Sequence, residues 1–359
     1  MLVKIGVALS GGVDSAVAAA ILKAEGHDVV GYHMKNLPDT LFELVPEKKK
    51  VCCSPSDTID THKIAAKLGI ELRIVKLNDI FRKEIIDYFI REYQAGKTPN
   101  PCVRCNDLMK FGALMEKAFG DGMEKFASGH YARIVEHPKY GLSLARGVAK
   151  YKDQAYFLSR IKRRKLPYII FPNGNMTKEE IRDIARELGL PVHSKKESQE
   201  LCFIPDNDYR RFLLEEGIEI KPGEIVDLEG NVLGRHKGLA FYTVGQRRGL
   251  GIVSDKKLYV VALDADKNRV VVGPKEAVMR KKFRAIEPNW LADLDEKELR
   301  CQCQIRSNMK AQGATIRIFS NIVEVEFDKP ALAITPGQLA VFYDGNIVLG
   351  SAFIENVVS

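Results

Sequence analysis

The sequence predicts an α/β fold, a doubly wound parallel sheet, followed by a small, mainly β central domain and a C-terminal β-barrel. Three observations lead to this prediction. Apolar strand patterns alternate with helical patterns up to about residue 128, as in consecutive βαβ units. Beyond residue 206 the chain changes to short strands with frequent glycine, and from about residue 282 β-branched runs are separated by turns, which is typical of a small barrel. We expect domains at residues 1–205, 206–281 and 282–359.

The N-terminal third carries the clearest alternation of strands and helices. Leu2–Leu9 is a nearly continuous apolar run, as expected of a strand buried on both faces. Ala16–Lys23 is rich in alanine and predicts a helix. Further strands are expected at residues 29–34 and 71–75 and ending at residue 128, and helices at 57–68, 79–94 and 177–188. Thr177, with Glu180 three residues later, predicts a capping box at the start of the last of these helices. The ligand crevice of such a sheet lies at the carboxyl ends of its strands.

A glycine turn joins the first strand to the first helix. It reads Leu9-Ser10-Gly11-Gly12-Val13-Asp14-Ser15. Two adjacent glycines let backbone N–H groups approach an anion, and the start of a helix adds its positive dipole end. The spacing is neither GxxxxGKS/T nor GxGxxG. The turn therefore predicts a phosphate site, and the alternative is an ordinary glycine turn of an α/β fold.

Three cysteines are candidates for chemistry. Asn100-Pro101 is a good N-cap followed by the residue favoured at the first helical position. Cys102 and Cys105 would then lie one turn apart near a helix N-terminus, which lowers the pKa of a thiol. Cys202 follows in an apolar setting. The alternative is that these are small buried residues.

Composition limits the class of protein. Seven cysteines in 359 residues without a secretion signal favour thiols or ligands over a disulfide framework. No apolar run approaches the length of a membrane span, so we expect a cytoplasmic protein with no membrane partner. The net charge is +8, with basic runs at 160–165, 247–248 and 280–282, and it indicates a nucleic-acid partner. Residues 37–54 lack periodicity and are expected to form a mobile surface loop or lid.

The glycine turn resembles the PP-loop of the ATP pyrophosphatases, whose fold is adenine nucleotide alpha hydrolase-like. The resemblance implies that ATP is cleaved between its α- and β-phosphates, with Mg²⁺ assisting. It implies the following ATP-binding residues: Ala8, Leu9, Ser10, Gly11, Gly12, Val13, Asp14, Ser15, Met34 and Gly129.

The whole set of motifs is similar to that of the bacterial tRNA-specific 2-thiouridylases. The matching segments, in the family's order, are residues 9–15, 99–106, 129–133, 152–158, 195–205, 242–251 and 335–343. The resemblance implies an ATP-dependent tRNA uridine 2-sulfurtransferase. Such an enzyme adenylates the C2 carbonyl oxygen of the wobble uridine (U34) and replaces it with sulfur, releasing AMP and pyrophosphate. The implied partners are the tRNAs that accept lysine, glutamate and glutamine, and a sulfur-donor protein or cysteine desulfurase relay.

The resemblance also implies roles for single residues. Cys202 would carry a persulfide, and Cys105 would attack it and form a transient disulfide bond. Segments touching tRNA would be Asn100, Pro101 and Cys102; Lys152, Asp153 and Gln154; and Arg306 with Ser307. Two positions depart from the family. Many members have an aspartate, proposed as a general acid or base, three residues before the second cysteine. Here that position is Cys102, so this role does not transfer. Ser307 replaces an aromatic residue that would stack on a base.

Several alternatives stay open at this point. Cys102, Cys105 and Cys202 are three soft ligands that could hold a 4Fe–4S cluster with one open iron, and the sequence does not choose between cluster and persulfide relay. His130 is a lone histidine after a strand, a setting that is more often structural. Other functions are a PP-loop ligase for small molecules, a non-catalytic RNA-binding module, and a redox or zinc protein.

Overall fold

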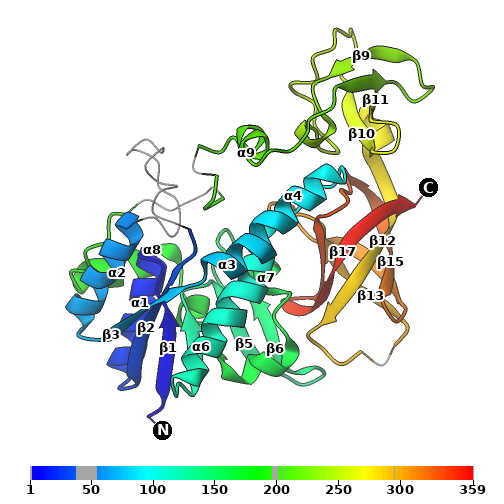
Figure 1. Ribbon diagram of the computed structural model, residues 1–359. Helices are drawn as coiled ribbons and strands as arrows, with labels where there is room; N and C mark the ends of the chain where they lie inside the picture. Colours follow the sequence, from blue (N-terminus) through cyan, green and yellow to red (C-terminus); the bar gives the residue numbers. More distant parts are fainter. Residues whose placement is uncertain (1, 38–54, 196–200, 205, 295, 359) are drawn as a thin grey trace. The chain divides into compact units, whose positions relative to one another are not determined.

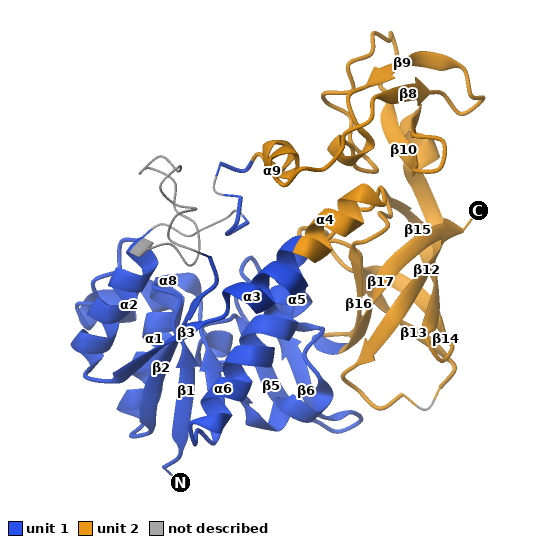
Figure 2. Cartoon of the chain, in the orientation of Figure 1, with its two compact units in different colours: residues 1–86, 101–207, 346–348 blue, residues 87–100, 208–345, 349–359 orange. Residues whose placement is uncertain are grey.

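The computed structural model describes residues 2–37, 55–195, 201–204, 206–294 and 296–358. The chain divides into two compact units (Figure 2). Unit 1 comprises residues 1–86, 101–207 and 346–348, and unit 2 comprises residues 87–100, 208–345 and 349–359. Apart from residue 37, the expected loop or lid at 37–54 lies outside the described residues. The division into three domains at residues 205 and 281 stays a prediction.

Unit 1 contains the predicted parallel sheet (Figure 1). Its five strands are ordered β3-β2-β1-β4-β7, and every neighbouring pair is parallel. The strands are β1 (Lys4–Ala8), β2 (Asp28–Lys35), β3 (Glu71–Lys76), β4 (Lys125–Ser128) and β7 (Ile169–Ile170). The chain proceeds from β1 to β2 and β3 on one side and later adds β4 on the other. The strand order therefore reverses between β1 and β4, where open α/β sheets bind ligands.

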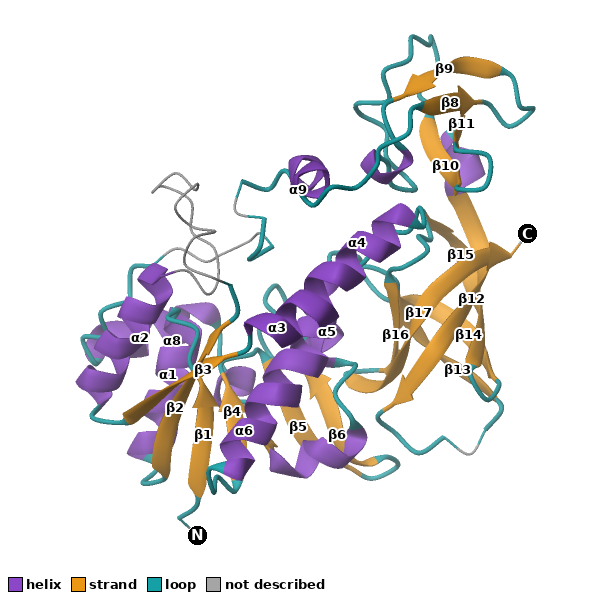
Figure 3. Ribbon diagram, viewed as in Figure 1, coloured by secondary structure: helices purple, strands orange, loops and turns teal. Residues whose placement is uncertain are grey.

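Helices pack on both faces of this sheet (Figure 3). Ile5 and Val7 of β1 join the core formed with helix α1, whereas a Cβ on Gly6 would meet Ala118 of α6 at 3.0 Å. Successive residues of a strand point to opposite faces, so β1 is buried on both sides, as its apolar run predicted. The helices of unit 1 are α1 (Val13–Ala24), α2 (Pro55–Leu68), α3 (Asn78–Phe81), α5 (Pro101–Arg104), α6 (Met115–Gly120), α7 (Ala155–Leu158) and α8 (Lys178–Glu187).

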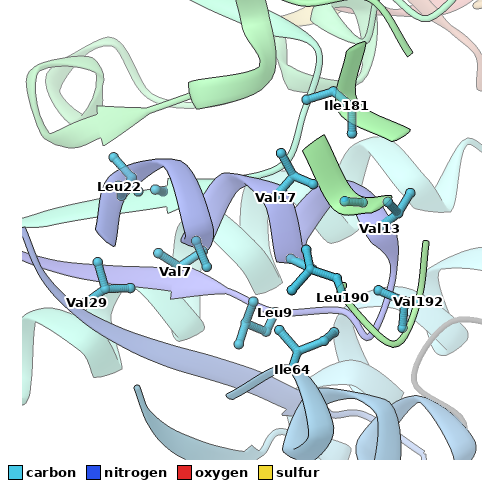
Figure 4. Close-up of a cluster of buried hydrophobic side chains, with 14 of the residues drawn as sticks. Val7, Leu9, Val13, Val17, Leu22, Val29, Ile64, Ile181, Leu190 and Val192 are labelled. Carbon is cyan, nitrogen blue, oxygen red and sulfur yellow. The ribbon is translucent and has the colours of Figure 1, made fainter. Parts of the chain in front are cut away.

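The core beneath α1 joins segments that are far apart in the sequence (Figure 4). Val13, Val17 and Leu22 of α1 pack with Val7 of β1 and Ile181 of α8, all at most 5% exposed. Burying each such side chain stabilises the fold by about 1.5 to 3 kcal/mol. This packing fixes α1, and with it the glycine turn, on the sheet. The capping box predicted at the start of α8 is confirmed, with both of its reciprocal hydrogen bonds present.

Unit 1 also contains structure that the sequence reading missed. Strands β5 (Ala132–His137) and β6 (Gly141–Arg146) form an antiparallel hairpin. The predicted helix at 79–94 is confirmed but includes a π-helical segment, η2 (Arg82–Ile86), before α4 (Asp87–Gln94) of unit 2. A second π-helix, η3 (Cys105–Leu114), follows α5. Short 3₁₀ segments are η4 (Arg163–Tyr168) and η5 (Pro172–Asn175) in unit 1, and η6 (Leu239–Phe241) and η7 (Lys275–Val278) in unit 2.

Unit 2 begins its β structure with a small four-stranded sheet ordered β10-β11-β8-β9. The strands are β8 (Gly223–Val226), β9 (Val232–His236), β10 (Tyr259–Asp264) and β11 (Arg269–Gly273). Their core includes Ile225, Val260 and Val270, which are fully buried. The helix α9 (Tyr209–Glu215) precedes them and was not predicted; Asp208 caps it by accepting hydrogen bonds from two backbone N–H groups.

The predicted C-terminal β-barrel is confirmed. Six strands follow the order β12-β15-β14-β13-β16-β17, and β12 also pairs with β17, which closes the ring. They are β12 (Met279–Trp290), β13 (Glu298–Gln304), β14 (Gln312–Ile318), β15 (Ile322–Leu332), β16 (Leu339–Asp344) and β17 (Ile347–Val358). Cys301 and Cys303 of β13 are both buried, and burial raises the pKa of both thiols. Among the described residues, no helix has the length and apolar character needed to cross a membrane.

Candidate functional site

A cavity of about 280 Å³ in unit 1 lies at the carboxyl ends of β1 and β4. Nine of the ten predicted ATP-binding residues line it: Ala8, Leu9, Ser10, Gly12, Val13, Asp14, Ser15, Met34 and Gly129. Further lining residues are Tyr32, His33, Asp57, Lys110, Leu114, Ser128, His130, Gln154 and Lys195. The cavity therefore lies at the reversal point of the sheet, where the topology predicts a ligand.

The glycine turn has a backbone that side chains would disrupt. Gly11 has a φ of +73°, and a Cβ there would lie 2.6 Å from the carbonyl oxygen of Asp57. The Ser15 hydroxyl accepts a hydrogen bond from the Ser10 N–H at 3.1 Å and donates one to the Gly12 carbonyl at 3.0 Å. These contacts hold the turn open over the first N–H groups of α1, which suit an anion.

The end of β4 packs directly on the start of α1. A Cβ on Gly129 would lie 2.5 Å from the carbonyl carbon of Asp14. The fully buried Asn173 donates from Nδ2 to the carbonyl oxygens of Asp14 (2.9 Å) and Gly129 (3.1 Å). This amide joins the two backbones that bound the cavity.

The carboxylate of Asp14 is held by two side chains from distant parts of unit 1. Lys178 Nζ donates to Asp14 Oδ1 at 2.6 Å, and Tyr131 Oη donates to the same atom at 2.6 Å. Lys178 is buried, and its ammonium lies 5.8 Å from the centre of the Tyr131 ring. The orientation of Asp14 toward the cavity is therefore fixed before any ligand binds.

Lys195 forms a second ion-pair cluster behind the glycine turn. Its Nζ donates to the Gly11 carbonyl at 2.8 Å, to Asp57 Oδ1 at 2.7 Å and to Asp60 Oδ2 at 2.6 Å. Burial lowers the pKa of Lys195, but the hydrogen bonds to the two carboxylates outweigh burial and raise it. Lys195 stays charged and ties the turn to α2. Gly11, the predicted ATP residue outside the cavity lining, is thus fixed through its carbonyl group.

His33 supports the same region from β2. It is 1% exposed, and its Nδ1 lies 2.8 Å from the Leu9 carbonyl oxygen while Nε2 lies 3.0 Å from Thr58 Oγ1. Burial lowers the pKa of His33, so the ring is neutral near pH 7 and serves as a hydrogen-bonding brace between β1 and α2.

The three candidate cysteines all belong to unit 1. A helix begins at Pro101, as predicted; Cys102 is exposed, and the half-buried Cys105 begins the π-helix η3. Cys202 is also half-buried, and the next residue, Phe203, packs edge-on against Phe81. Across the part of the chain that the structure describes, no three His, Cys, Asp or Glu side chains gather as a metal-binding group.

The predicted tRNA-contacting residues lie in two settings. Lys152 is partly exposed and Ser307 exposed, whereas Asp153 accepts hydrogen bonds from the Gly147 and Ala155 N–H groups and from Arg146. Gln154 Oε1 accepts from the Tyr131 N–H, and Gln154 also lines the cavity. The Asp153 carboxylate is therefore committed to the fold around α7.

Arg306 is likewise engaged inside unit 2. Its Nη2 donates to the carbonyl oxygens of Val244 (3.1 Å) and Ala333 (3.0 Å) and to Thr335 Oγ1 (2.7 Å). Near the other predicted segment, Gln338 Nε2 donates to the Thr98 carbonyl oxygen at 2.9 Å. Asn100 is the last residue of that part of unit 2, while the buried Pro101 and exposed Cys102 belong to unit 1.

Comparison with known proteins gives the family. Three family models match in succession: the tRNA methyl transferase HUP domain (residues 3–206), the tRNA methyl transferase PRC-barrel domain (210–274) and the aminomethyltransferase β-barrel domain (280–354). The tRNA-specific 2-thiouridylase MnmA of Thermotoga maritima is 48% identical over 98% of this chain and 99% of its own. The chain belongs to the tRNA-specific 2-thiouridylase family.

Further 2-thiouridylases agree along the full length. The MnmA of Pseudothermotoga lettingae is 46% identical over 99% of this chain and 100% of its own, and that of Fervidobacterium nodosum is 47% identical over the same shares. A solved 4-thiouridine synthetase–RNA complex with bound ATP aligns with 60% of this chain and 50% of its own, at 17% identity and a TM-score of 0.33. Independently of that structure, the family model and the parallel sheet confirm the PP-loop fold expected from the glycine turn.

Several residues of the cavity and its supports were not predicted from the sequence. Lys110 and Asp57 line the cavity, and Lys178 and Asp60 support it. Lys178 pairs with Asp14 across 164 positions, and Asp60 pairs with Lys195 across 135. Each is a single charged residue on a helix, a pattern shared with any solvated helix face. The one local signal was the position of Lys178 at the start of a capped helix.

Proposed function

We propose that this chain uses ATP to transfer sulfur to C2 of the wobble uridine (U34) of tRNA. One observation carries the proposal: a single cavity gathers the glycine turn, the end of β4 and Lys110 of η3, and η3 begins with Cys105. The glycine turn, which we propose as the phosphate site, and the helix that begins with the half-buried Cys105 thus border the same region of unit 1. The 2-thiouridylase activity for which the family is named supports the same reaction.

The first step activates the base. The C2 carbonyl oxygen of uridine forms a bond to the α-phosphorus of ATP, while the bond from that phosphorus to the bridging oxygen breaks. Pyrophosphate leaves with the electron pair, and the N3 proton of uridine is released to solvent. The backbone N–H groups of the glycine turn and of the start of α1 would receive the pyrophosphate charge.

The second step replaces oxygen with sulfur. The terminal sulfur of a Cys202 persulfide attacks C2, and AMP departs with the former carbonyl oxygen. The Cys105 thiolate then attacks the Cys202 sulfur, so that a disulfide forms and the transferred sulfur stays on C2. A thiol reductant reopens the disulfide, and a persulfide-bearing donor protein reloads Cys202.

Mg²⁺ fits the donors that line the cavity. Asp14 and Asp57 supply carboxylate oxygens there, and Mg²⁺ in nucleotide sites is held by one or two carboxylates together with substrate phosphates. When bound, the ion would neutralise charge on the departing pyrophosphate.

The tRNAs for lysine, glutamate and glutamine are the proposed substrates, and the cytoplasm is the proposed location.

Exposed basic side chains support an RNA substrate within each unit. Lys162 and Arg164 of unit 1 and Arg247, Arg248 and Lys281 of unit 2 are exposed, although Arg160 of the first run is buried. Exposed lysine and arginine neutralise backbone phosphates and release counterions.

The test is reconstitution with purified components. Unmodified tRNA transcript, Mg²⁺, ATP and a cysteine desulfurase with cysteine should yield 2-thiouridine, measured by mass analysis of nucleosides. Cys105→Ser and Cys202→Ser should abolish the product while ATP binding survives, and Cys301→Ala, a buried barrel control, should retain it. A small-molecule ligase would tolerate Cys105→Ser. Binding of tRNA without AMP formation would instead indicate an RNA-binding module.

The iron–sulfur route is the second mechanism to test. We favour the persulfide relay because Cys102, Cys105 and Cys202 do not assemble as a group of ligands in the described structure. Anaerobic purification followed by absorbance and iron analysis separates the two mechanisms. A colourless, iron-free protein that thiolates tRNA supports the relay, and activity that depends on stoichiometric iron overturns it.

A further inference from the structure

The lysines that line the cavity differ in their partners. Lys195 contacts the carboxylates of Asp57 and Asp60, so its charge is compensated. Within the described residues, Lys110 takes part in no ion pair, and its Nζ instead lies 3.5 Å from Nε2 of His130. Asp14 and Asp57, the carboxylates of the cavity lining, pair with Lys178 and Lys195 rather than with Lys110. The Lys110 ammonium is therefore a positive charge directed at a neutral partner.

The hydrogen bonds of His130 define which nitrogen carries its proton. Burial and the neighbouring Lys110 charge hold the pKa of His130 well below its ordinary value, so the ring is neutral near pH 7. An ammonium group only donates, so a hydrogen bond from Lys110 at this contact requires an unprotonated Nε2. Nδ1 then carries the hydrogen and donates to Ser128 Oγ at 2.7 Å. Ser128 is buried at the end of β4 and fixes this orientation.

Cys105 and Lys110 lie on the part of η3 that precedes its kink at Gly112. In a π-helix the backbone bonds join residues five apart, so Lys110 is one turn along from Cys105. The glycine turn and the start of α1 bound the same cavity from β1. During adenylation the α-phosphorus is joined to the pyrophosphate on one side and to the uridine oxygen on the other. The α-phosphorus must therefore lie between the glycine turn and η3, the helix that begins with Cys105.

We propose that Lys110 binds the α-phosphate of ATP, and that His130 is a positioning residue that holds the Lys110 ammonium toward the cavity. This inference rests on the proposed function for the identity of the nucleotide. A cation at the α-phosphate stabilises the charge that grows on its oxygens during transfer of AMP. A neutral imidazole is suited to this task because it orients the ammonium without cancelling its charge.

The test measures nucleotide binding without tRNA, by calorimetry on the full chain. Lys110→Met should weaken binding of both Mg²⁺–ATP and AMP at least tenfold and leave adenosine binding unchanged, while Lys110→Arg should restore most of the affinity. Lys83→Met, an equal loss of charge at an exposed π-helical site, is the matched control. Unchanged ATP affinity in Lys110→Met overturns the proposal. A loss for ATP but not for AMP overturns the assignment to the α-phosphate.

The role of His130 is tested by changing its acceptor. His130→Leu should lower AMP affinity several-fold, and His130→Gln, whose amide oxygen can accept from Lys110, should recover it. A merely structural role predicts equal effects in both variants, which would overturn the positioning role. These binding results do not depend on thiolation, so failure of the proposed sulfur transfer would appear separately, as loss of 2-thiouridine in the unsubstituted protein.

Discussion

Gly129 lies so close to the start of α1 that a Cβ atom would approach the carbonyl carbon of Asp14 to 2.5 Å and its carbonyl oxygen to 2.6 Å. Backbone on both sides leaves no flexible group to move aside. The same contact brings the end of β4 and the glycine turn to one cavity. Stability and nucleotide binding therefore depend on one missing side chain.

Gly129→Ala should lower the free energy of unfolding by about 1 to 3 kcal/mol, as overpacking does, and should weaken ATP binding because the cavity wall shifts. Urea denaturation and calorimetry measure the two effects. Gly120→Ala is the matched control, since a Cβ there meets nothing within 4 Å and alanine favours a helix end. Equal stability of the two variants would contradict the prediction.

Lys195→Met should destabilise unit 1 by about 3 to 5 kcal/mol, because it leaves the buried Asp57 carboxylate without its cation. ATP affinity should fall as well, since the Gly11 carbonyl loses its donor. Arg186→Met, which breaks the exposed pair with Asp183, should leave the unfolding free energy nearly unchanged. A Lys195 variant as stable as the Arg186 variant would show that the cluster does not support the turn.

The pH dependence of stability should carry a contribution from Asp121. Hydrogen bonds from Lys117 and Arg73 lower its pKa from 3.8 to about 2. A lowered pKa in the folded state means that the contribution is present above about pH 4 and is lost as the pH falls toward 2. The stability difference between the unsubstituted protein and Asp121→Asn should therefore shrink over this range in urea titrations. A difference that is constant from pH 6 to pH 2 would contradict it.

Arg306→Ala should destabilise unit 2 by about 2 kcal/mol, because the Val244 carbonyl loses its Arg306 hydrogen bond. Any loss of tRNA affinity would then be partly indirect. Arg247→Ala removes an exposed charge, and should weaken tRNA binding and reduce its salt dependence without changing the melting temperature. If Arg306→Ala melts normally yet loses tRNA, a direct contact explains it better than our interpretation.

Local signals gave the most accurate sequence predictions. The strand of β1, the glycine turn, the capping box at Thr177 and the helix start at Pro101 are each encoded within a few neighbouring residues. The π-helical segments were missed because short π-helical stretches within helices have no local sequence signal of their own. The hairpin β5–β6 was missed because its turn lacks the Asn-Gly or Asp-Gly pair that marks a two-residue turn. Cys102 and Cys105 were predicted to lie on one turn of an α-helix. In the structure the α-helix ends at Arg104, and a π-helix begins at Cys105.

The electrostatic framework of the cavity could not be predicted from the sequence. Asp14 is paired with Lys178, and Asp57 with Lys195, across 164 and 138 positions. Only the folded sheet brings such residues together, and nothing in their local sequence distinguishes them from surface lysines. The same limit applied to Asp153 and Arg306, which the family resemblance assigned to tRNA and whose polar groups the fold engages internally.

The closed barrel makes β12 and β16 depend on a shared neighbour. Strand β17 pairs with both of them, so a chain cut after Asp344 would expose two unsatisfied strand edges at once. Exposed edges recruit strands from other molecules. Such a truncated chain should aggregate rather than persist as a loosened monomer, and attempts to trim this protein for crystallisation should spare residues 347–358.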